Sequence, residues 1–220
     1  MTRSVTVAVT AARLAVAALM LAAVTRLLLD GVEAGTFVVW NFFGFFTIQN
    51  NLIGVAALVA AAAFARRTAP AWVEYLRVCA AIYLGIVVTV YWTLLAPLED
   101  DVTHWTNLVV HGLSGVALLA DWLLVGPRHP LPLGRLWVVI LYPSLWVTVV
   151  LIRGATDGWF PYPFLDPANG YGSIAVVVAG IIAAGLAVGA ALFRATGLRV
   201  VTTDATGASA VVPPGAEAAP

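Results

Sequence analysis

The stretch Ser173–Phe193, SIAVVVAGIIAAGLAVGAALF, is 21 residues long and contains no charged side chain. A helix rises about 1.5 Å per residue, so about 20 such residues cross the roughly 30 Å hydrocarbon core of a bilayer. This stretch therefore predicts a membrane-spanning helix. Five further apolar runs precede it along the chain: Val7–Leu29, Phe37–Phe64, Trp72–Leu95, Trp105–Val125 and Arg135–Ile152.

The composition of the whole chain agrees with six spans. Its 220 residues are 62% hydrophobic and 10% charged, whereas a soluble domain is about 45–50% apolar. The sequence predicts an all-α, polytopic membrane helix bundle with six transmembrane helices over residues 1–199, and no separate soluble domain. The segment Val200–Pro220 is rich in Ala, Gly, Thr and Pro and lacks periodicity, so we expect a disordered cytoplasmic tail over residues 200–220.

Charge separates the two ends of the predicted bundle. Arginines in short loops mark the cytoplasmic side of a membrane protein. Here the arginines lie near the two termini and between the second and third and the fourth and fifth runs. The other three connections are acidic, and Arg153 is the one arginine in them. Both termini are therefore expected in the cytoplasm, and the plasma membrane is the expected location. The arginines concerned are Arg3, Arg66, Arg67, Arg128, Arg135, Arg194 and Arg199.

Polar side chains recur along the fourth apolar run. His104, Asn107, His111, Ser114 and Asp121 are spaced by three, four, three and seven residues. These offsets place all five on one stripe of a helix, which is expected to face protein or water rather than lipid. A histidine inside a membrane span is a candidate functional residue because it is costly in hydrocarbon.

The second run carries a matching polar patch of Thr47, Asn50 and Asn51 at positions i, i+3 and i+4. In a helix that starts at Phe37, Thr47 would lie about 15 Å below the outer end, and His111 would lie about 10–12 Å below the start of its own span. The two side chains are therefore expected to meet in the outer half of the bundle.

Thr47 and His111 suggest nucleophilic catalysis. A threonine hydroxyl needs an adjacent base, and a neutral histidine is the usual one. Amides of Asn50, Asn51 or Asn107 could donate to a developing oxyanion. The same residues also have a structural interpretation, since a threonine in a membrane helix often bonds the carbonyl four residues before it and amides often join helices.

Two charged residues predict an ion pair, and no group of residues predicts a metal. Asp121 and Arg77 lie at matching depths near the inner ends of their spans, so we expect a structural pair, with Glu74 and Arg135 as competing partners. Asp121 is about 15 Å from His111 along the helix axis, which is too far for one coordination shell. We expect no metal and no cofactor.

The connection Arg153–Gly172 contains four glycines and three prolines together with several aromatic residues. Its prolines exclude a regular helix, while its aromatic residues argue against a free coil. We expect it to fold over the outer mouth of the bundle as a plug or lid. Pro143, inside the fifth run, is expected to kink that helix.

Three segments resemble a family of bacterial six-span membrane proteins: FFGFFTIQNNL (Phe42–Leu52), NLVVHGLSGVALLADWLL (Asn107–Leu124) and LYPSLWVTVVLIRGATDGWFPYPFLDPANGYG (Leu141–Gly172). That group is similar to the eukaryotic androgen-induced membrane-protein family, whose members hydrolyse fatty acid esters of hydroxy fatty acids. The resemblance implies a catalytic threonine in an early span and a catalytic histidine in a later one. Matched by motif, these are Thr47 and His111.

Three functions remain open from the sequence. The first is an intramembrane lipid-ester hydrolase with a threonine nucleophile and a histidine base. The second is a non-catalytic lipid-binding or small-solute membrane protein with a polar cavity, and the third is a structural partner subunit. The expected partners are membrane lipids and a lipid ester substrate, with no nucleic acid, and the oligomeric state stays undetermined.

Overall fold

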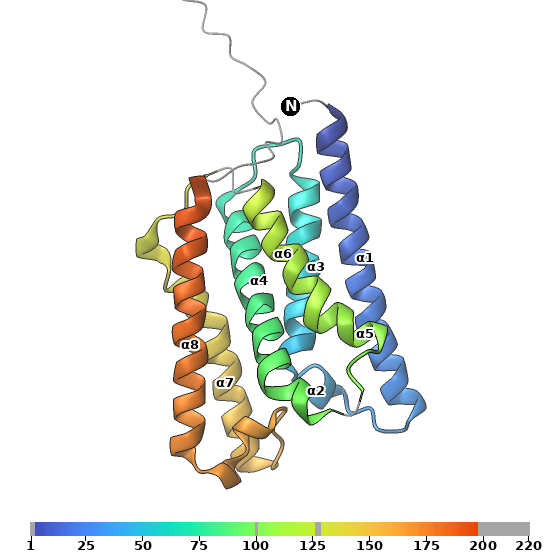
Figure 1. Cartoon of the computed structure of the whole chain (residues 1–220), viewed down its shortest axis with the longest axis vertical. Coiled ribbons are helices and arrows are strands. Elements are labelled where there is room, and N and C mark those ends of the chain that lie inside the picture. Colours follow the sequence, from blue (N-terminus) through green and yellow to red (C-terminus); the bar gives the residue numbers. More distant parts are fainter. Residues whose placement is uncertain (1–2, 100, 126–128, 198–220) are drawn as a thin grey trace, which may run out of the picture.

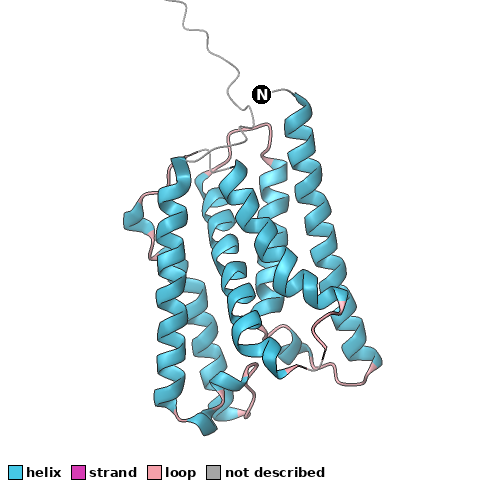
Figure 2. Cartoon of the chain, in the orientation of Figure 1, coloured by secondary structure: helices cyan, strands magenta, loops and turns pink. Residues whose placement is uncertain are grey.

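The structure, a computed structural model, describes residues 3–99, 101–125 and 129–197. The predicted tail over residues 200–220 lies outside the described residues. The described part contains helices and loops and no strand (Figure 2). Its main helices are α1 (Arg3–Glu33), α2 (Val39–Phe42), α3 (Phe46–Ala63), α4 (Ala71–Val90), α5 (Trp105–Leu108), α6 (Ser114–Ala120), α7 (Val138–Thr156) and α8 (Tyr171–Arg194).

Six helical segments of the described chain are long and apolar enough to cross a membrane, which confirms the predicted all-helical fold with six candidate spans. Helix α4 lies at the centre, between α3 and the α5–α6 segment on one side and α8 on the other (Figure 1). Helices α7 and α8 form a pair beside α4, and α1 packs on α3. The start of α1 and the end of α8 lie at the same end of the bundle, as an even number of spans requires.

The second apolar run is broken, so the prediction of one continuous helix from Phe37 is wrong. Helix α2 ends at Phe42, Phe45 is extended (φ −65°, ψ 130°), and α3 begins at Phe46. Thr47 is therefore the second residue of a helix rather than a residue deep inside one. The expected depth of 15 Å below Phe37 fails for the same reason.

Side chains replace the backbone hydrogen bonds that this break removes. Gln49 Nε2 donates to the Phe43 carbonyl at 2.6 Å, and Trp146 Nε1 donates to the Gly44 carbonyl at 2.9 Å. Position 44 also requires a glycine, since a Cβ there would lie 2.5 Å from the Trp159 ring. The break is thus held together by residues of α3, α7 and the connection Arg153–Gly172.

The fourth span alternates between α-helix and π-helix. A π-helical turn, Val109–Leu113, contains His111, and a second, Asp121–Val125, begins at Asp121. A third π-helical turn, Tyr91–Leu95, follows α4. Such turns shift the helical phase by about one residue and are frequent at functional sites. Two of the three turns contribute a ring, His111 and Tyr91, to the site described below.

Pro143 lies inside α7 and lacks the N–H that would bond the carbonyl of Val139. The hydroxyl of Tyr83, on α4, donates to this carbonyl at 2.9 Å. The bond that the proline removes within α7 is therefore replaced by one between α7 and α4.

Four charged side chains form a buried network among the helices of the bundle. Asp121 Oδ2 lies 2.6 Å from Arg77 Nη2, and Asp121 Oδ1 lies 2.6 Å from Arg13 Nε. Arg77 Nη1 lies 2.9 Å from Glu74 Oε2. Arg13 also donates to the Ala61 carbonyl at 3.1 Å. The network joins α1, α3, α4 and the fourth span; the sequence analysis predicted the Arg77–Asp121 pair and did not foresee Arg13.

Candidate active site

Thr47 lies in the first turn of α3, where backbone N–H groups have no partner within the helix. Its own N–H donates to the hydroxyl oxygen of Tyr162 at 3.3 Å, and its Oγ1 lies 3.4 Å from the same oxygen. In the pair of hydroxyls either oxygen can be the donor. When the phenol donates, the threonine hydroxyl keeps its own hydrogen for another group.

Tyr162 comes from the outer loop, and sequence reasoning missed it. Its ring packs edge-on to Phe45 at 5.9 Å and stacks on Phe164 at 5.3 Å. Burial raises the pKa of the Tyr162 phenol above its ordinary value, while hydrogen bonds from the backbone of Thr47 and Phe46 act in the opposite direction. The phenol is therefore neutral. The sequence predicts a plug or lid over the outer mouth for the connection Arg153–Gly172; in the structure its Tyr162 packs on Phe45 and carries its hydroxyl to Thr47.

His111 is fixed from two directions. Its ring lies flat on the ring of Tyr91, with centroids 3.7 Å apart and an interplanar angle of 5°. Its Nδ1 lies 2.5 Å from Asn107 Oδ1. A stacked ring with one nitrogen bonded has little rotational freedom, so the second nitrogen, Nε2, has a defined direction.

The hydrogen bonds of Asn107 decide which imidazole nitrogen carries the proton. Asn107 Nδ2 donates to the Val102 carbonyl at 2.9 Å and to the Tyr91 hydroxyl at 2.6 Å. A carbonyl can only accept, so the amide nitrogen must face Val102 and Oδ1 must face the histidine. Nδ1 of His111 is then the donor, which leaves Nε2 with a free lone pair when the ring is neutral.

The chain of hydrogen bonds continues to a carboxylate. The hydroxyl of Tyr91 donates to Glu99 Oε2 at 2.6 Å. Each hydroxyl and amide in the series from His111 through Asn107 and Tyr91 to Glu99 therefore has one consistent direction of donation. This arrangement stabilises positive charge on the imidazole, because each donor is polarised toward the carboxylate.

Thr47 and His111 line one cavity of about 430 Å³, which we call the His111 cavity. Tyr91, Tyr162 and Glu99 line it as well. Among the described residues no hydrogen bond joins Thr47 to His111; the nearest hydroxyl partner of Thr47 is Tyr162. The structure thus brings the two predicted residues to one cavity without direct contact.

The three amides predicted to stabilise an oxyanion use their hydrogens within the protein. Asn51 Nδ2 donates to the carbonyls of Thr47 and Val110, at 2.9 and 3.1 Å, and joins α3 to the fourth span. Asn50 Nδ2 donates to the Phe46 carbonyl at 2.7 Å. With Asn107 committed to His111 and its neighbours, these amides act as structural and orienting groups. In the described part of the chain, Asn50 Oδ1 and Asn51 Oδ1 are buried without a hydrogen-bond partner.

The remaining members of the polar stripe are not at the cavity. His104 precedes α5, is exposed, and its Nδ1 lies 2.7 Å from Thr106 Oγ1. Ser114 is buried and donates to the Val110 carbonyl at 3.2 Å. Asp121 belongs to the buried charge network.

A comparison of the chain with protein-family models, with curated protein sequences and with solved structures found no match in any of the three. The geometry of the described residues is therefore the basis on which the function of this six-span protein is argued.

Proposed function

We propose that the protein is an intramembrane hydrolase of lipid esters, with Thr47 as nucleophile and His111 as base. The observation that carries the proposal is that both side chains line one cavity. In addition, Asn107 binds Nδ1 of His111 and thereby leaves Nε2 as the basic nitrogen. A hydroxyl, an imidazole and a group that orients the imidazole are the parts that nucleophilic hydrolysis requires.

The reaction proceeds in two steps. Thr47 Oγ1 attacks the ester carbonyl carbon while His111 Nε2 takes the hydroxyl proton, and the same imidazolium gives this proton to the leaving alcohol. A water molecule then attacks the acyl-threonine, with Nε2 again taking a proton, and the carboxylic acid and free Thr47 are released. Approach of the two side chains requires the substrate, since catalytic contacts are often loose before it binds.

The oxyanion would be stabilised by the start of α3 rather than by side-chain amides. The N–H of Thr47 and the phenol of Tyr162 meet at one point, where the partial positive charge of a helix N-terminus also acts. The ester oxygen would join these donors as negative charge develops. Such preorganised donors are the usual source of stabilisation in acyl transfer.

Three segments resemble a group of bacterial six-span membrane proteins, and the similarity of that group to hydrolases of fatty acid esters of hydroxy fatty acids supports this class of substrate. The surroundings support it too, since both residues lie in segments that are long and apolar enough for a bilayer, where a lipid ester is already concentrated. We propose that the protein belongs to the group of bacterial six-span membrane proteins named above.

Purified protein in lipid nanodiscs, assayed on a fatty acid ester of a hydroxy fatty acid, tests the proposal. Thr47→Ala and His111→Ala should each lower the rate by about a thousandfold or more, because each removes a group that acts in the transition state. Thr89→Ala and His129→Ala are matched controls at exposed positions and should retain full activity. Turnover that survives in either site variant would reject the mechanism.

The second candidate is a non-catalytic lipid-binding protein, and one observation favours it: the closest hydroxyl partner of Thr47 is Tyr162 and not His111. A fluorophosphonate separates the two functions. An activated Thr47 becomes covalently labelled, whereas a simple binding cavity stays unmodified.

We further propose that the protein resides in the plasma membrane with both termini in the cytoplasm. The arginine distribution supports this orientation. A cysteine introduced at Asp157 in a Cys79→Ala background should react with an impermeant maleimide on intact cells, and a cysteine at Arg66 should react only after permeabilisation. The reverse pattern would contradict the orientation.

A further inference from the structure

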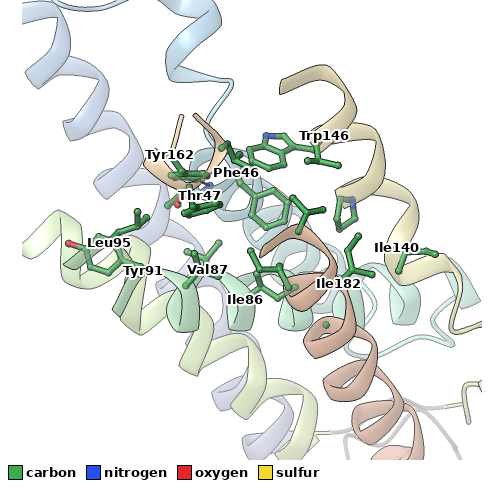
Figure 3. A pocket seen from close by; sticks show the side chains of 18 of the residues that line it. Phe46, Thr47, Ile86, Val87, Tyr91, Leu95, Ile140, Trp146, Tyr162 and Ile182 are labelled. Carbon is green, nitrogen blue, oxygen red and sulfur yellow. Dashed lines mark hydrogen bonds between the residues drawn. The ribbon is translucent and has the colours of Figure 1, made fainter. Parts of the chain in front are cut away.

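A second cavity lies on the other side of Thr47, among α4, α7 and α8 (Figure 3). It measures about 80 Å³, and we call it the apolar cavity. Away from Thr47 its walls are hydrocarbon. Each helix contributes branched side chains, among them Ile86 and Val87 from α4, Ile140 and Val147 from α7, and Ile181 and Ile182 from α8.

The apolar cavity and the His111 cavity meet at the candidate active site. Thr47, Tyr91, Leu95 and Tyr162 line both. Figure 3 places Thr47 and Tyr162 together at one side of the apolar cavity, with Ile140 on α7 and Ile182 on α8 at the other. Thr47 and Tyr162 therefore lie in the part of the wall that the two cavities share.

The lining of the apolar cavity selects the chemical class of its occupant. A cavity lined by such side chains does not hold ordered water, because water needs two to four polar partners. A head group or a charged solute would find no partner beyond the Thr47 end. A narrow space among branched aliphatic side chains fits a single unbranched alkyl chain.

The length of the cavity can be estimated along α8. Its lining runs from Val178 to Leu186, eight residues apart, which corresponds to about 12 Å of helix. Toward one end of this stretch, a Cβ at Gly185 would lie 3.0 Å from Ile86 Cδ1. Gly185 and Ile86, which both line the cavity, therefore pack closely against each other.

We propose that the apolar cavity binds the acyl chain of the ester, and that the Gly185–Ile86 contact limits the length of chain that fits. The assignment of the acyl arm rests on the proposed hydrolase function, since the acyl carbonyl must lie at Thr47. The leaving alcohol then occupies the His111 cavity, where Nε2 returns the proton to it.

Binding is tested apart from catalysis with the Thr47→Ala variant. The full chain in nanodiscs is irradiated with a decanoic acid that carries a diazirine near its methyl end, and the modified peptides are identified by mass spectrometry. Cross-links should fall on α4, α7 and α8 near Ile86, Ile140 and Ile182, and unlabelled decanoic acid should compete with them. Cross-links spread over the lipid-facing side chains of α1 would overturn the inference.

Chain-length preference is the second test, with p-nitrophenyl butanoate, decanoate and palmitate as substrates. Gly185→Leu should lower the decanoate-to-butanoate ratio of kcat/KM by about tenfold or more, and Ile86→Ala should shift preference toward palmitate. Gly180→Leu is the matched control, because Gly180 is on the same helix and a Cβ there would meet nothing within 4 Å. An unchanged ratio in the two site variants would overturn the length limit. If one variant fails to fold, an unchanged ratio in the other overturns it alone.

The two proposals fail in different ways. A wild-type protein that cleaves none of the esters but cross-links at Ile86, Ile140 and Ile182 would reject the hydrolase and keep the alkyl-chain site. A wild-type protein that cleaves the esters but cross-links elsewhere would reject the acyl-chain site and keep the hydrolase.

Discussion

Asn107 is the residue on which the chemistry of His111 depends. Its amide is locked by the Val102 carbonyl and the Tyr91 hydroxyl, so its oxygen holds Nδ1 of the imidazole. Replacement by leucine keeps the volume and removes this bond, and the ring can then adopt the other tautomer. We expect Asn107→Leu to lower kcat by about ten- to a hundredfold with little change in KM. A lowered affinity with unchanged kcat would show that Asn107 acts on substrate instead.

Tyr162 is the residue whose hydroxyl contacts the proposed nucleophile. Because the phenol would turn its single hydrogen to the developing oxyanion, Tyr162→Phe should lower kcat by about a hundredfold and leave the fold intact. Tyr171→Phe, at an exposed position at the start of α8, is the control and should have no effect. A rate equal to wild type in Tyr162→Phe would exclude the phenol from the reaction.

At the residue scale the sequence predicts Thr47 and His111 as a pair, and the structure places both at one cavity. The sequence also predicts that amides donate to an oxyanion, whereas the N–H groups of these amides donate within the protein. The sequence does not distinguish an asparagine that donates to substrate from one that accepts from a histidine ring. The orientation of the amide depends on neighbours such as Val102, which the fold brings near. Tyr162 carried no signal of its own, because a tyrosine between two prolines in a loop has no periodicity that places its side chain.

At the scale of the element, α7 illustrates how one helix depends on another. Pro143 leaves the Val139 carbonyl without a donor, and Tyr83 supplies one. We expect Tyr83→Phe to lower the free energy of unfolding by about 1 kcal/mol, within the range measured for interhelical hydrogen bonds in membranes. Pro143→Ala restores the N–H, so the double variant Tyr83→Phe, Pro143→Ala should recover most of this loss.

The coupling in this double-mutant cycle is measured by reversible unfolding in mixed micelles. Additive losses from the two substitutions would contradict the account of α7, because they would mean that the tyrosine and the proline act on different groups.

The broken second span is the element that the sequence predicted incorrectly. Its hydropathy is continuous from Phe37 to Phe64, and one glycine in an apolar run is a weak signal. The break depends on Gln49 of the same run, which bonds Phe43, and on Trp146 and Trp159, which reach Gly44 from two other parts of the chain. The contacts of the two tryptophans are tertiary, so the pattern of one segment cannot contain them. The break nonetheless positions Thr47 at the start of a helix.

For the whole molecule, the buried charge network is the main polar connection among the spans. Removal of Asp121 would leave Arg13 and Arg77 buried without the carboxylate that both contact. Breaking a buried pair costs about 3–5 kcal/mol, so Asp121→Ala should strongly lower the thermal midpoint of unfolding in nanodiscs. Asp101→Ala, in an exposed loop, should change it little. A midpoint like that of wild type in Asp121→Ala would mean that the network does not stabilise the bundle.

The six spans were predictable because apolar length alone sets the requirement for crossing a bilayer. The network was predictable only in part. Arg77 and Asp121 lie near span ends, where depths can be compared, but Arg13 lies within a run of small apolar residues. An arginine within an apolar span needs a partner in the bundle. The position of Arg13 was therefore the one signal in the sequence that it joins a buried ion pair.

The most direct test of the central claim is the mass of the Thr47 peptide after incubation with a fluorophosphonate. The account predicts a covalent adduct on Thr47 in the wild-type protein and in His129→Ala, and its loss in His111→Ala. An unmodified Thr47 in the wild type, or an adduct that forms equally well in His111→Ala, would contradict a nucleophile activated by His111.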